Sequence, residues 1–225
     1  PFKGKFEWAI DYYKSMAKKL NITMKLGKEV TAQEVLALKP YSILVATGSN
    51  VISIPLEGLD QVQTVQAHDV LANDMQFANK KVVVIGGGIT GLETALYINR
   101  QGTNQVSVVD MLPEWPVDML DMRYQNEALL EVRHCNDQGV ALFYNNKVVK
   151  FADGKLFIES TKDGEVKELP ADVIVLSVGV KPNDALWQEL LASGHPSVWK
   201  AGDAIATGKI NKAVLHGSKF GYSLN

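Results

Sequence analysis

The stretch from Lys81 to Ala95 constrains the fold more than any other part of this chain. It begins with four apolar residues, Val82 to Ile85, which do not alternate with polar ones and therefore predict a strand buried on both faces. Gly86, Gly88 and Gly91 follow with the spacing G-x-G-x-x-G, and a helix is expected after them. In this pattern the first glycine permits a tight turn, the second lets the backbone approach a diphosphate, and the third lets the helix pack close to the sheet. The free amides and the positive end of the helix would then face the phosphates.

A second apolar run extends this pattern into a strand–loop–helix–strand unit. The run from Val106 ends on Asp110, which lies 19 positions after Gly91. A carboxylate there can accept hydrogen bonds from both hydroxyls of an adenosine ribose, each contributing about 1.5–3 kcal/mol. Glycine-rich turns also recur in unrelated proteins, so the alternative is a tight turn without a ligand. With the terminal acid, the unit predicts a dinucleotide site.

Asp110 also bears on which dinucleotide binds. A 2′-phosphate would meet this carboxylate as a like charge, at a cost of about 4 kcal/mol for a pair roughly 4 Å apart at an effective dielectric near 20. The segment from Met111 to Pro116 contains no Arg or Lys that would bind such a phosphate. The sequence therefore favours NADH over NADPH.

Composition excludes several other classes of function. The net charge of −2 and the lack of a basic stripe argue against nucleic acid as a partner, and no apolar run is long enough to cross a membrane. Cys135 is the single cysteine, so an internal disulfide and a C-x-x-C redox pair are excluded, and its neighbour His134 is poorly spaced for a shared metal ion. A cytoplasmic protein without a metal site is the expectation. The chain starts at Pro1 and stops inside an expected helix, which suggests a piece of a larger protein.

Hydrophobic periodicity and turn residues predict an α/β fold. Helices are expected over 6–20, 35–38 (with a capping box at Thr31 and Glu34), 68–71, 92–102, 121–135, 185–192 and from 209 onward. Strands are expected over 22–26, 42–47, 82–85, 106–110, 140–145, 147–151, 156–160, 166–169, 172–178 and 198–202. Residues 55–66 are expected to be irregular, and the helix over 121–135 to face inward with Met122, Leu129, Leu130 and Val132.

These elements suggest two domains. Residues 73–180 would form a self-contained domain in which a parallel sheet is joined to an antiparallel meander of the strands between 140 and 169. Residues 1–72 and 181–225 flank it and would need each other to build a core. An inserted domain explains this order economically.

Four segments that are typical of one protein family occur in this order: Leu44-Val-Ala-Thr-Gly48, Gly86 to Glu93, Ser177 to Asn183, and Lys200-Ala-Gly-Asp-Ala204. With them, the chain resembles the two-dinucleotide-binding flavoprotein oxidoreductases of the pyridine nucleotide-disulfide reductase superfamily. The opening Pro1-Phe-Lys-Gly and the variant Ile89-Thr-Gly-Leu-Glu-Thr are most similar to one branch, the C-terminal half of Old Yellow Enzyme-like reductases such as 2,4-dienoyl-CoA reductase and 2-enoate reductase.

The resemblance implies a Rossmann-like NAD(P)-binding domain inserted in a partial FAD-binding domain, which is a second Rossmann-like domain. It implies that NADH is bound by Gly86, Gly87, Gly88, Ile89, Thr90, Gly91 and Asp110, with Glu93 and Gly179 near the nicotinamide half. It also implies that Asp203, after Gly202, bonds the ribityl chain of FAD and that Thr47 and Gly48 line the crossing between domains. The alternatives are that Asp203 is a helix-cap or turn aspartate and that Glu93 only complements the helix dipole.

Three departures from the family pattern limit what this piece would do. The first glycine fingerprint, which holds the FAD diphosphate, and the paired redox cysteines are not in this sequence. In the resembled branch a flavin barrel and iron–sulfur cysteines precede this region, so that missing N-terminal part is the expected partner and FAD is not expected to be held by this piece alone. No side chain here is expected to act as a catalytic acid or base, because the cofactors carry the chemistry.

Two other functions stay open. One is a structural ADP-binding module like that of trimethylamine dehydrogenase-like proteins, because the adenosine half alone would satisfy Gly86 to Asp110. The other is a reductase of another branch, of the NADH oxidase or ferredoxin reductase type.

Overall fold

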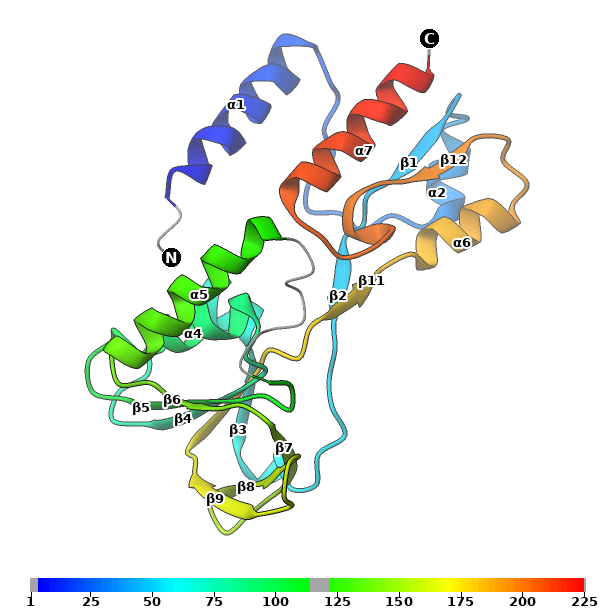
Figure 1. Cartoon of the computed structure of the whole chain (residues 1–225). Helices are drawn as coiled ribbons and strands as arrows, with labels where there is room; N and C mark the ends of the chain where they lie inside the picture. Colours follow the sequence, from blue (N-terminus) through cyan, green and yellow to red (C-terminus); the bar gives the residue numbers. More distant parts are fainter. Residues whose placement is uncertain (1–3, 114–121, 225) are drawn as a thin grey trace. The chain divides into compact units, whose positions relative to one another are not determined.

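The computed structural model describes residues 4–113 and 122–224. This part of the chain forms two compact units (Figure 1). The central unit is Ile52–Gly179, and the flanking unit is the rest of the described chain. This central unit includes β3 (Gln63–Gln66), which pairs in parallel with β10 (Val173–Leu176), so the unit contains residues before position 73.

A parallel sheet is the frame of the central unit, as expected for an α/β fold. The described strands follow the order β3-β10-β4-β5-β6, where β4 is Lys81–Ile85, β5 is Gln105–Val109 and β6 is Ala141–Phe143. From β4 the chain moves to β5 and β6 on one side and later returns to β10 on the other side. The carboxyl ends of β4 and its neighbours therefore meet where the strand order reverses, which is where open α/β sheets bind ligands.

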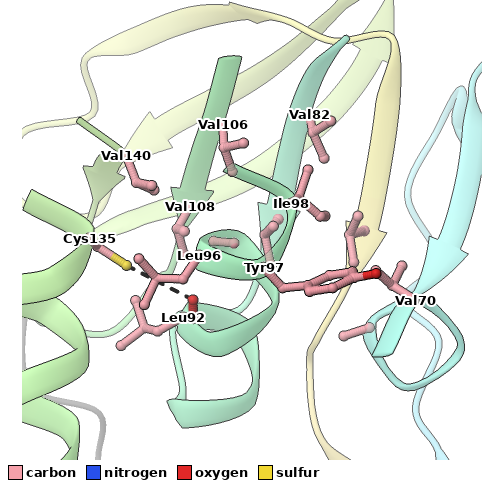
Figure 2. Close-up of a cluster of buried hydrophobic side chains, with 14 of the residues drawn as sticks. Val70, Val82, Leu92, Leu96, Tyr97, Ile98, Val106, Val108, Cys135 and Val140 are labelled. Carbon is pink, nitrogen blue, oxygen red and sulfur yellow. Dashed lines mark hydrogen bonds between the residues drawn. The ribbon is translucent and has the colours of Figure 1, made fainter. Parts of the chain in front are cut away.

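The two faces of the sheet bury different sets of side chains. Val82 and Val84 pack with α3 (Ala67–Ala72), α4 (Ile89–Asn99) and α5 (Met122–Asp137), while Val83 and Ile85 pack with the meander on the other face. Figure 2 shows Leu92 and Leu96 of α4 lying between the strands and Cys135 of α5. Because successive side chains of a strand point to opposite faces, the unbroken apolar run of β4 fills both cores.

The meander consists of β7 (Asn146–Ala152), β8 (Lys155–Ser160) and β9 (Val166–Pro170), paired antiparallel in this order. The prediction that 140–145 begins the meander was wrong, because β6 pairs in parallel with β5. The backbone reverses at Asn145, whose φ is +57°. The short η1 helix (Leu59–Gln61) precedes β3.

The flanking unit has two short strand pairs. β1 (Ile43–Val45) pairs in parallel with β12 (Val198–Lys200), and β2 (Ser49–Val51) pairs antiparallel with β11 (Val180–Pro182). Its other elements are α1 (Phe6–Lys19), α2 (Ala32–Ala37), α6 (Ala185–Ala192), η3 (Gly202–Ala204) and α7 (Ile210–Ser223). A small core of Ile43, Val45 and Leu190 joins segments from both ends of the sequence.

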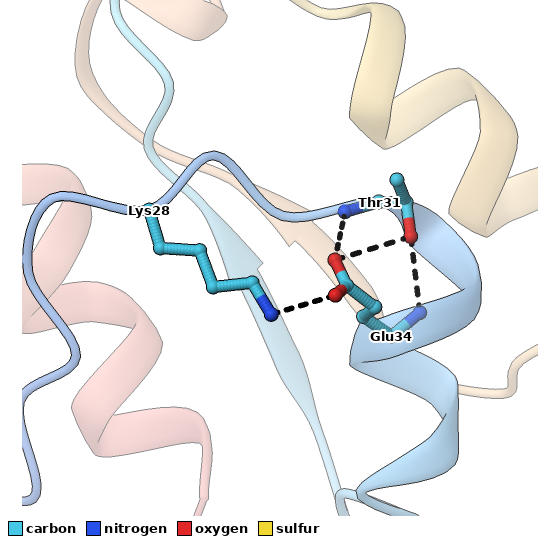
Figure 3. Close-up of polar contacts among 3 residues, drawn as sticks. All are labelled: Lys28, Thr31 and Glu34. Carbon is cyan, nitrogen blue, oxygen red and sulfur yellow. Dashed lines mark hydrogen bonds and ion pairs between the residues drawn. The ribbon is translucent and has the colours of Figure 1, made fainter.

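The predicted capping box at the start of α2 is confirmed (Figure 3). The Glu34 amide donates to Thr31 Oγ1 at 3.3 Å, and the Thr31 amide donates to Glu34 Oε2 at 3.0 Å. Lys28 Nζ lies 2.6 Å from Glu34 Oε1. These contacts with Lys28 and Thr31 lower the pKa of the Glu34 carboxyl.

Other local predictions differ from the structure. Residues 22–26 form no strand, because alternation alone does not make one without a partner among the described strands. On α5, Val132 is buried as expected, but Leu129 and Leu130 are 40% and 47% exposed. The side chain of Met122 lies outside the described part. Ala128, Val132 and Cys135 form the inward stripe of α5 instead, at spacings of four and three residues.

Candidate functional site: a cavity beside the glycine loop

Gly86 and Gly91 hold the loop between β4 and α4 in a shape that a larger residue would disrupt. Gly86 has a φ of +107°, and a Cβ on it would lie 2.2 Å from the carbonyl oxygen of Ser177. A Cβ on Gly91 would lie 1.9 Å from the carbonyl oxygen of Gly86. The first glycine thus makes the turn and the third lets the helix approach the end of the strand, as the spacing predicts.

Gly88 differs from these two glycines because its surroundings are open. A Cβ on Gly88 meets no described heavy atom within 4 Å, and its φ of −67° is accessible to any residue. Gly88 is the N-cap of α4 and has no side chain with which to cap the first amides of the helix. The positive end of α4 therefore begins at a place where a negatively charged group has room to approach.

The carboxylate of Asp110 is fixed against this loop. Its Oδ2 accepts from the amide of Gly87 at 2.6 Å, and its Oδ1 accepts from the amide of Leu112 at 2.8 Å. Each carboxylate oxygen has a further lone pair available for a ligand hydroxyl. The sequence places Asp110 after β5, but it does not reveal that the carboxylate is bonded to the glycine loop itself.

A cavity of about 680 Å³ lies in the central unit at the carboxyl ends of β4, β5 and β10. Gly86, Gly88 and Asp110 line it together with Ser177 and Gly179. The rest of its lining is mostly apolar and comes from the segment 52–56, from 109–112 and from the start of β7. This volume is within the usual range for cofactor sites, and a mostly apolar lining with few polar groups is typical of them.

The structure brings together part of the predicted site. Gly86, Gly88, Asp110 and Gly179 line the cavity. The other predicted residues of this region, Gly87, Ile89, Thr90, Gly91 and Glu93, lie in the same loop and the first turns of α4, and the Glu93 side chain is half-buried.

Sequence reasoning missed several residues that line the cavity. Ser177 follows β10, and its position after a buried parallel strand is a signal that would have indicated it. Lys147 and Val148 of β7 and the segment 52–56 also line the cavity. They come from the meander and from the segment that precedes η1, and no local sequence motif identifies them as part of a site.

The predicted flavin residues lie in the flanking unit, after the ends of the adjacent strands β1 and β12. Thr47 Oγ1 donates to the carbonyl of Asn183, and the amide of Asn183 donates to the carbonyl of Gly48 at 2.9 Å. Asp203 Oδ1 accepts from the amide of Gly208 at 3.0 Å, and Ser49 Oγ lies 3.4 Å from its Oδ2. Gly202 has a φ of +61°. Asp203 thus closes its own loop, and its role toward a flavin stays a prediction.

Cys135 is buried between α5 and α4 and lies away from the cavity lining. Its thiol is 3.9 Å from the carbonyl oxygen of Leu92 (Figure 2). Burial raises the pKa of this thiol to about 12, and the carboxylate of Glu131 adds to the rise. A neutral thiol in this position packs as a small apolar group.

The described residues contain neither a metal-binding cluster nor a helix that could span a membrane. Residues 4–113 and 122–224 hold no group of three or more His, Cys, Asp or Glu side chains that is arranged to bind a metal ion. In the same part of the chain, no helix combines the length and apolar character that crossing a bilayer requires.

Comparison with known proteins places this architecture in a family. Residues 9–215 match the model of the pyridine nucleotide-disulphide oxidoreductases. NADH oxidase of Thermoanaerobacter brockii is 29% identical over all of this chain and 34% of its own length. Bilirubin reductase of Mediterraneibacter gnavus is 32% identical over 81% of this chain and 27% of its own length. The chain thus spans about a third of these relatives.

Solved structures agree with this match. A 2-naphthoyl-CoA reductase complex superposes with a TM-score of 0.81 at 28% identity, covering 96% of this chain and 32% of the other. Histamine dehydrogenase from Rhizobium, at 20% identity and a TM-score of 0.71 over 86% of this chain and 32% of its own, shares the fold. With its glycine loop and parallel sheet, the chain belongs to the pyridine nucleotide-disulphide oxidoreductase family of FAD- and NAD(P)H-dependent flavoproteins.

Proposed function

We propose that this chain is the NADH-binding portion of an FAD-dependent oxidoreductase. The observation that carries the proposal is the open space over Gly88 at the start of α4, beside the fixed carboxylate of Asp110 and inside a cavity of about 680 Å³. NADH bound there would supply a hydride for transfer to FAD. In domain terms, the central unit would be the NAD(P)H-binding domain, inserted in a partial FAD-binding domain.

In this proposal the residues of the chain bind and orient the dinucleotide. The first amides of α4 and the loop from Gly86 to Gly91 hold the diphosphate, because that is where free N–H groups and the positive end of the helix coincide. The carboxylate of Asp110 accepts from the ribose hydroxyls and is kept in place by Gly87 and Leu112. The apolar lining, which includes Val148, Val178 and Leu56, excludes water from the ligand.

The remaining electron path would belong to the rest of the protein. We propose that FAD passes electrons through an iron–sulfur centre to a second flavin, which reduces an unsaturated organic acceptor. The class of acceptor is supported by two relatives, bilirubin reductase and cinnamate reductase of Clostridium sporogenes, the latter 28% identical over 84% of this chain. The iron–sulfur centre and the second flavin rest on the resemblance to the Old Yellow Enzyme-like reductases alone. In the flanking unit, Thr47, Gly48, Gly202 and Asp203 would contribute to the flavin site.

Calorimetric titration of the chain with NADH, NAD, NADPH and ADP tests the binding proposal. We expect NADH to bind more tightly than ADP, because the nicotinamide half gains contacts in the cavity, and more tightly than NADPH, because Asp110 repels a 2′-phosphate. Failure to bind NADH would refute the proposal.

The same titration separates the proposal from a structural ADP-binding module. If ADP binds as tightly as NADH, the nicotinamide half makes no productive contact and the structural module is the better account. The fold shared with histamine dehydrogenase does not decide between the two, because a likeness at 20% identity concerns the fold alone.

A further inference from the structure

Lys147 and Glu159 form an ion pair on the meander at the edge of the cavity. They are direct cross-strand partners on β7 and β8, and Lys147 Nζ lies 2.9 Å from Glu159 Oε1. Among the described residues that line the cavity, Lys147 is the single cation and Asp110 is the single anion. The cavity therefore contains one basic group, and a residue outside the lining already binds it.

The position of Lys147 connects it to the ribose end of the proposed site. The amide of Asn146 donates to the carbonyl of Asp110 at 2.9 Å, so Lys147 directly follows the residue that is bonded to the backbone of the ribose-binding aspartate. A phosphate on the 2′ oxygen would project into this neighbourhood. There it would meet the charges of Asp110 and Glu159 against that of Lys147, a net negative environment.

The exposure of the pair indicates that its partners can be exchanged. The side chains of Lys147 and Glu159 are 49% and 32% exposed. An ion pair of this exposure is weak, and a lysine side chain has four flexible carbon–carbon bonds with which to turn toward another anion. The ammonium of Lys147 would therefore serve a nearby phosphate if Glu159 did not compete for it.

We propose that Glu159 strengthens the preference for NADH over NADPH by holding the ammonium of Lys147 away from the 2′ position of the adenosine ribose. Glu159 acts through Lys147 and is thus a positioning residue. The inference rests on the proposed function, because it requires the adenosine half to lie beside Asp110. It adds a second determinant of specificity to the one that Asp110 provides.

The test is calorimetric titration of the 225-residue chain and four variants with NADH, NADPH, AMP and adenosine 2′,5′-bisphosphate. The variants are Glu159→Gln, Lys147→Gln, the double variant with both changes, and Glu168→Gln. Glu168 pairs with Lys155 on the same meander and neither lines the cavity, so Glu168→Gln is a matched control for the loss of one negative charge.

We expect Glu159→Gln to tighten NADPH and the bisphosphate by about two- to fivefold, the size expected from a half-exposed charge pair. NADH and AMP should change by less than about twofold, because their 2′ hydroxyl is uncharged. Lys147→Gln should weaken NADPH, and the double variant should lose the gain of Glu159→Gln. The gain should also diminish at high salt.

Three results would overturn the inference. One is an unchanged ratio of NADPH to NADH affinity in Glu159→Gln, and another is an equal gain in Glu168→Gln or in the double variant. The third is an equal tightening of NADH and AMP, which would place Lys147 at the 5′-phosphates. All three presuppose that the wild-type chain binds NADH, so they refute this inference and leave the proposed function intact. A wild-type chain that does not bind NADH refutes both.

Discussion

Gly88 offers the sharpest test of where the phosphates lie. Substitution by alanine adds one methyl group in a space that no described atom occupies, at a φ of −67° that alanine adopts freely. Alanine is a poorer N-cap than glycine by up to about 1 kcal/mol, and the lower entropy of the unfolded chain offsets roughly 0.4–1 kcal/mol of this. The free energy of unfolding should therefore change by less than about 1 kcal/mol. In a thermal melt this limit corresponds to a shift of the midpoint by roughly 2–4 °C at most.

Binding should respond much more strongly than stability. A diphosphate displaced by the new methyl group loses at least one charge-assisted hydrogen bond to the loop, about 1.5–3 kcal/mol, which corresponds to a roughly 10- to 150-fold weaker Kd for NADH. Calorimetry measures the Kd, and circular dichroism on heating measures the fold.

Gly217→Ala is the matched control for this substitution. A Cβ at this position on α7 also meets no described heavy atom within 4 Å, but the residue lies outside the cavity lining. NADH affinity should stay at the wild-type value in this variant. If Gly88→Ala folds normally and binds NADH as tightly as wild type, the phosphates do not lie over this glycine and the proposed binding mode is refuted.

Three further predictions follow from the same unit. Gly91→Ala places a Cβ 1.9 Å from the carbonyl oxygen of Gly86, so we expect a loss of about 1–3 kcal/mol in the free energy of unfolding by urea; stability equal to wild type would show that α4 shifts freely. Asp110→Asn removes the charge that opposes a 2′-phosphate, so the ratio of NADPH to NADH affinity should rise by roughly tenfold in calorimetry, and an unchanged ratio would contradict the electrostatic argument. Burial raises the pKa of the Cys135 thiol in the folded state to about 12, above its ordinary value of 9.0. The stabilisation that comes from keeping this thiol protonated is therefore fully present below pH 9 and is lost as pH rises toward 12. Urea unfolding at several alkaline pH values should show this loss for wild type and not for Cys135→Ala, and an identical pH profile for both proteins would contradict it.

The predictable part of the site is the part encoded within a short stretch of sequence. Val82 to Ile85, the three glycines and Asp110 are constrained by neighbours in the sequence, and the structure places them as the spacing predicts. Their ligand stays a prediction. The two faces of β4 could also be anticipated, because an unbroken apolar run requires a core on each side.

The unpredicted part depends on contacts between distant segments. β3, with the sequence Gln63-Thr-Val-Gln66, is a partly exposed edge strand of the sheet, so it lacks the apolar run that would identify it. β6 has three residues, too few to distinguish a parallel strand from the start of the meander. Lys147 reaches the cavity because β7 folds back toward β5, and nothing local to Lys147 indicates this. On α5, the sequence pattern alone allows Leu129 and Leu130 to face either the core or the solvent. Packing against α4 decides which face is buried, and it buries Val132 and Cys135.

The hydrogen bonds of Asp110 to the amides of Gly87 and Leu112 have a consequence for any attempt to change the proposed preference from NADH to NADPH. Exchanging the acid for a basic residue would remove the repulsion and, in the same step, release two amides that shape the binding loop. In the proposed binding mode, the charge that would discriminate between NADH and NADPH therefore also braces the loop. A successful redesign therefore needs a second substitution that supplies a new acceptor for those amides, and screening libraries at position 110 alone should return mostly loosened, weakly binding proteins.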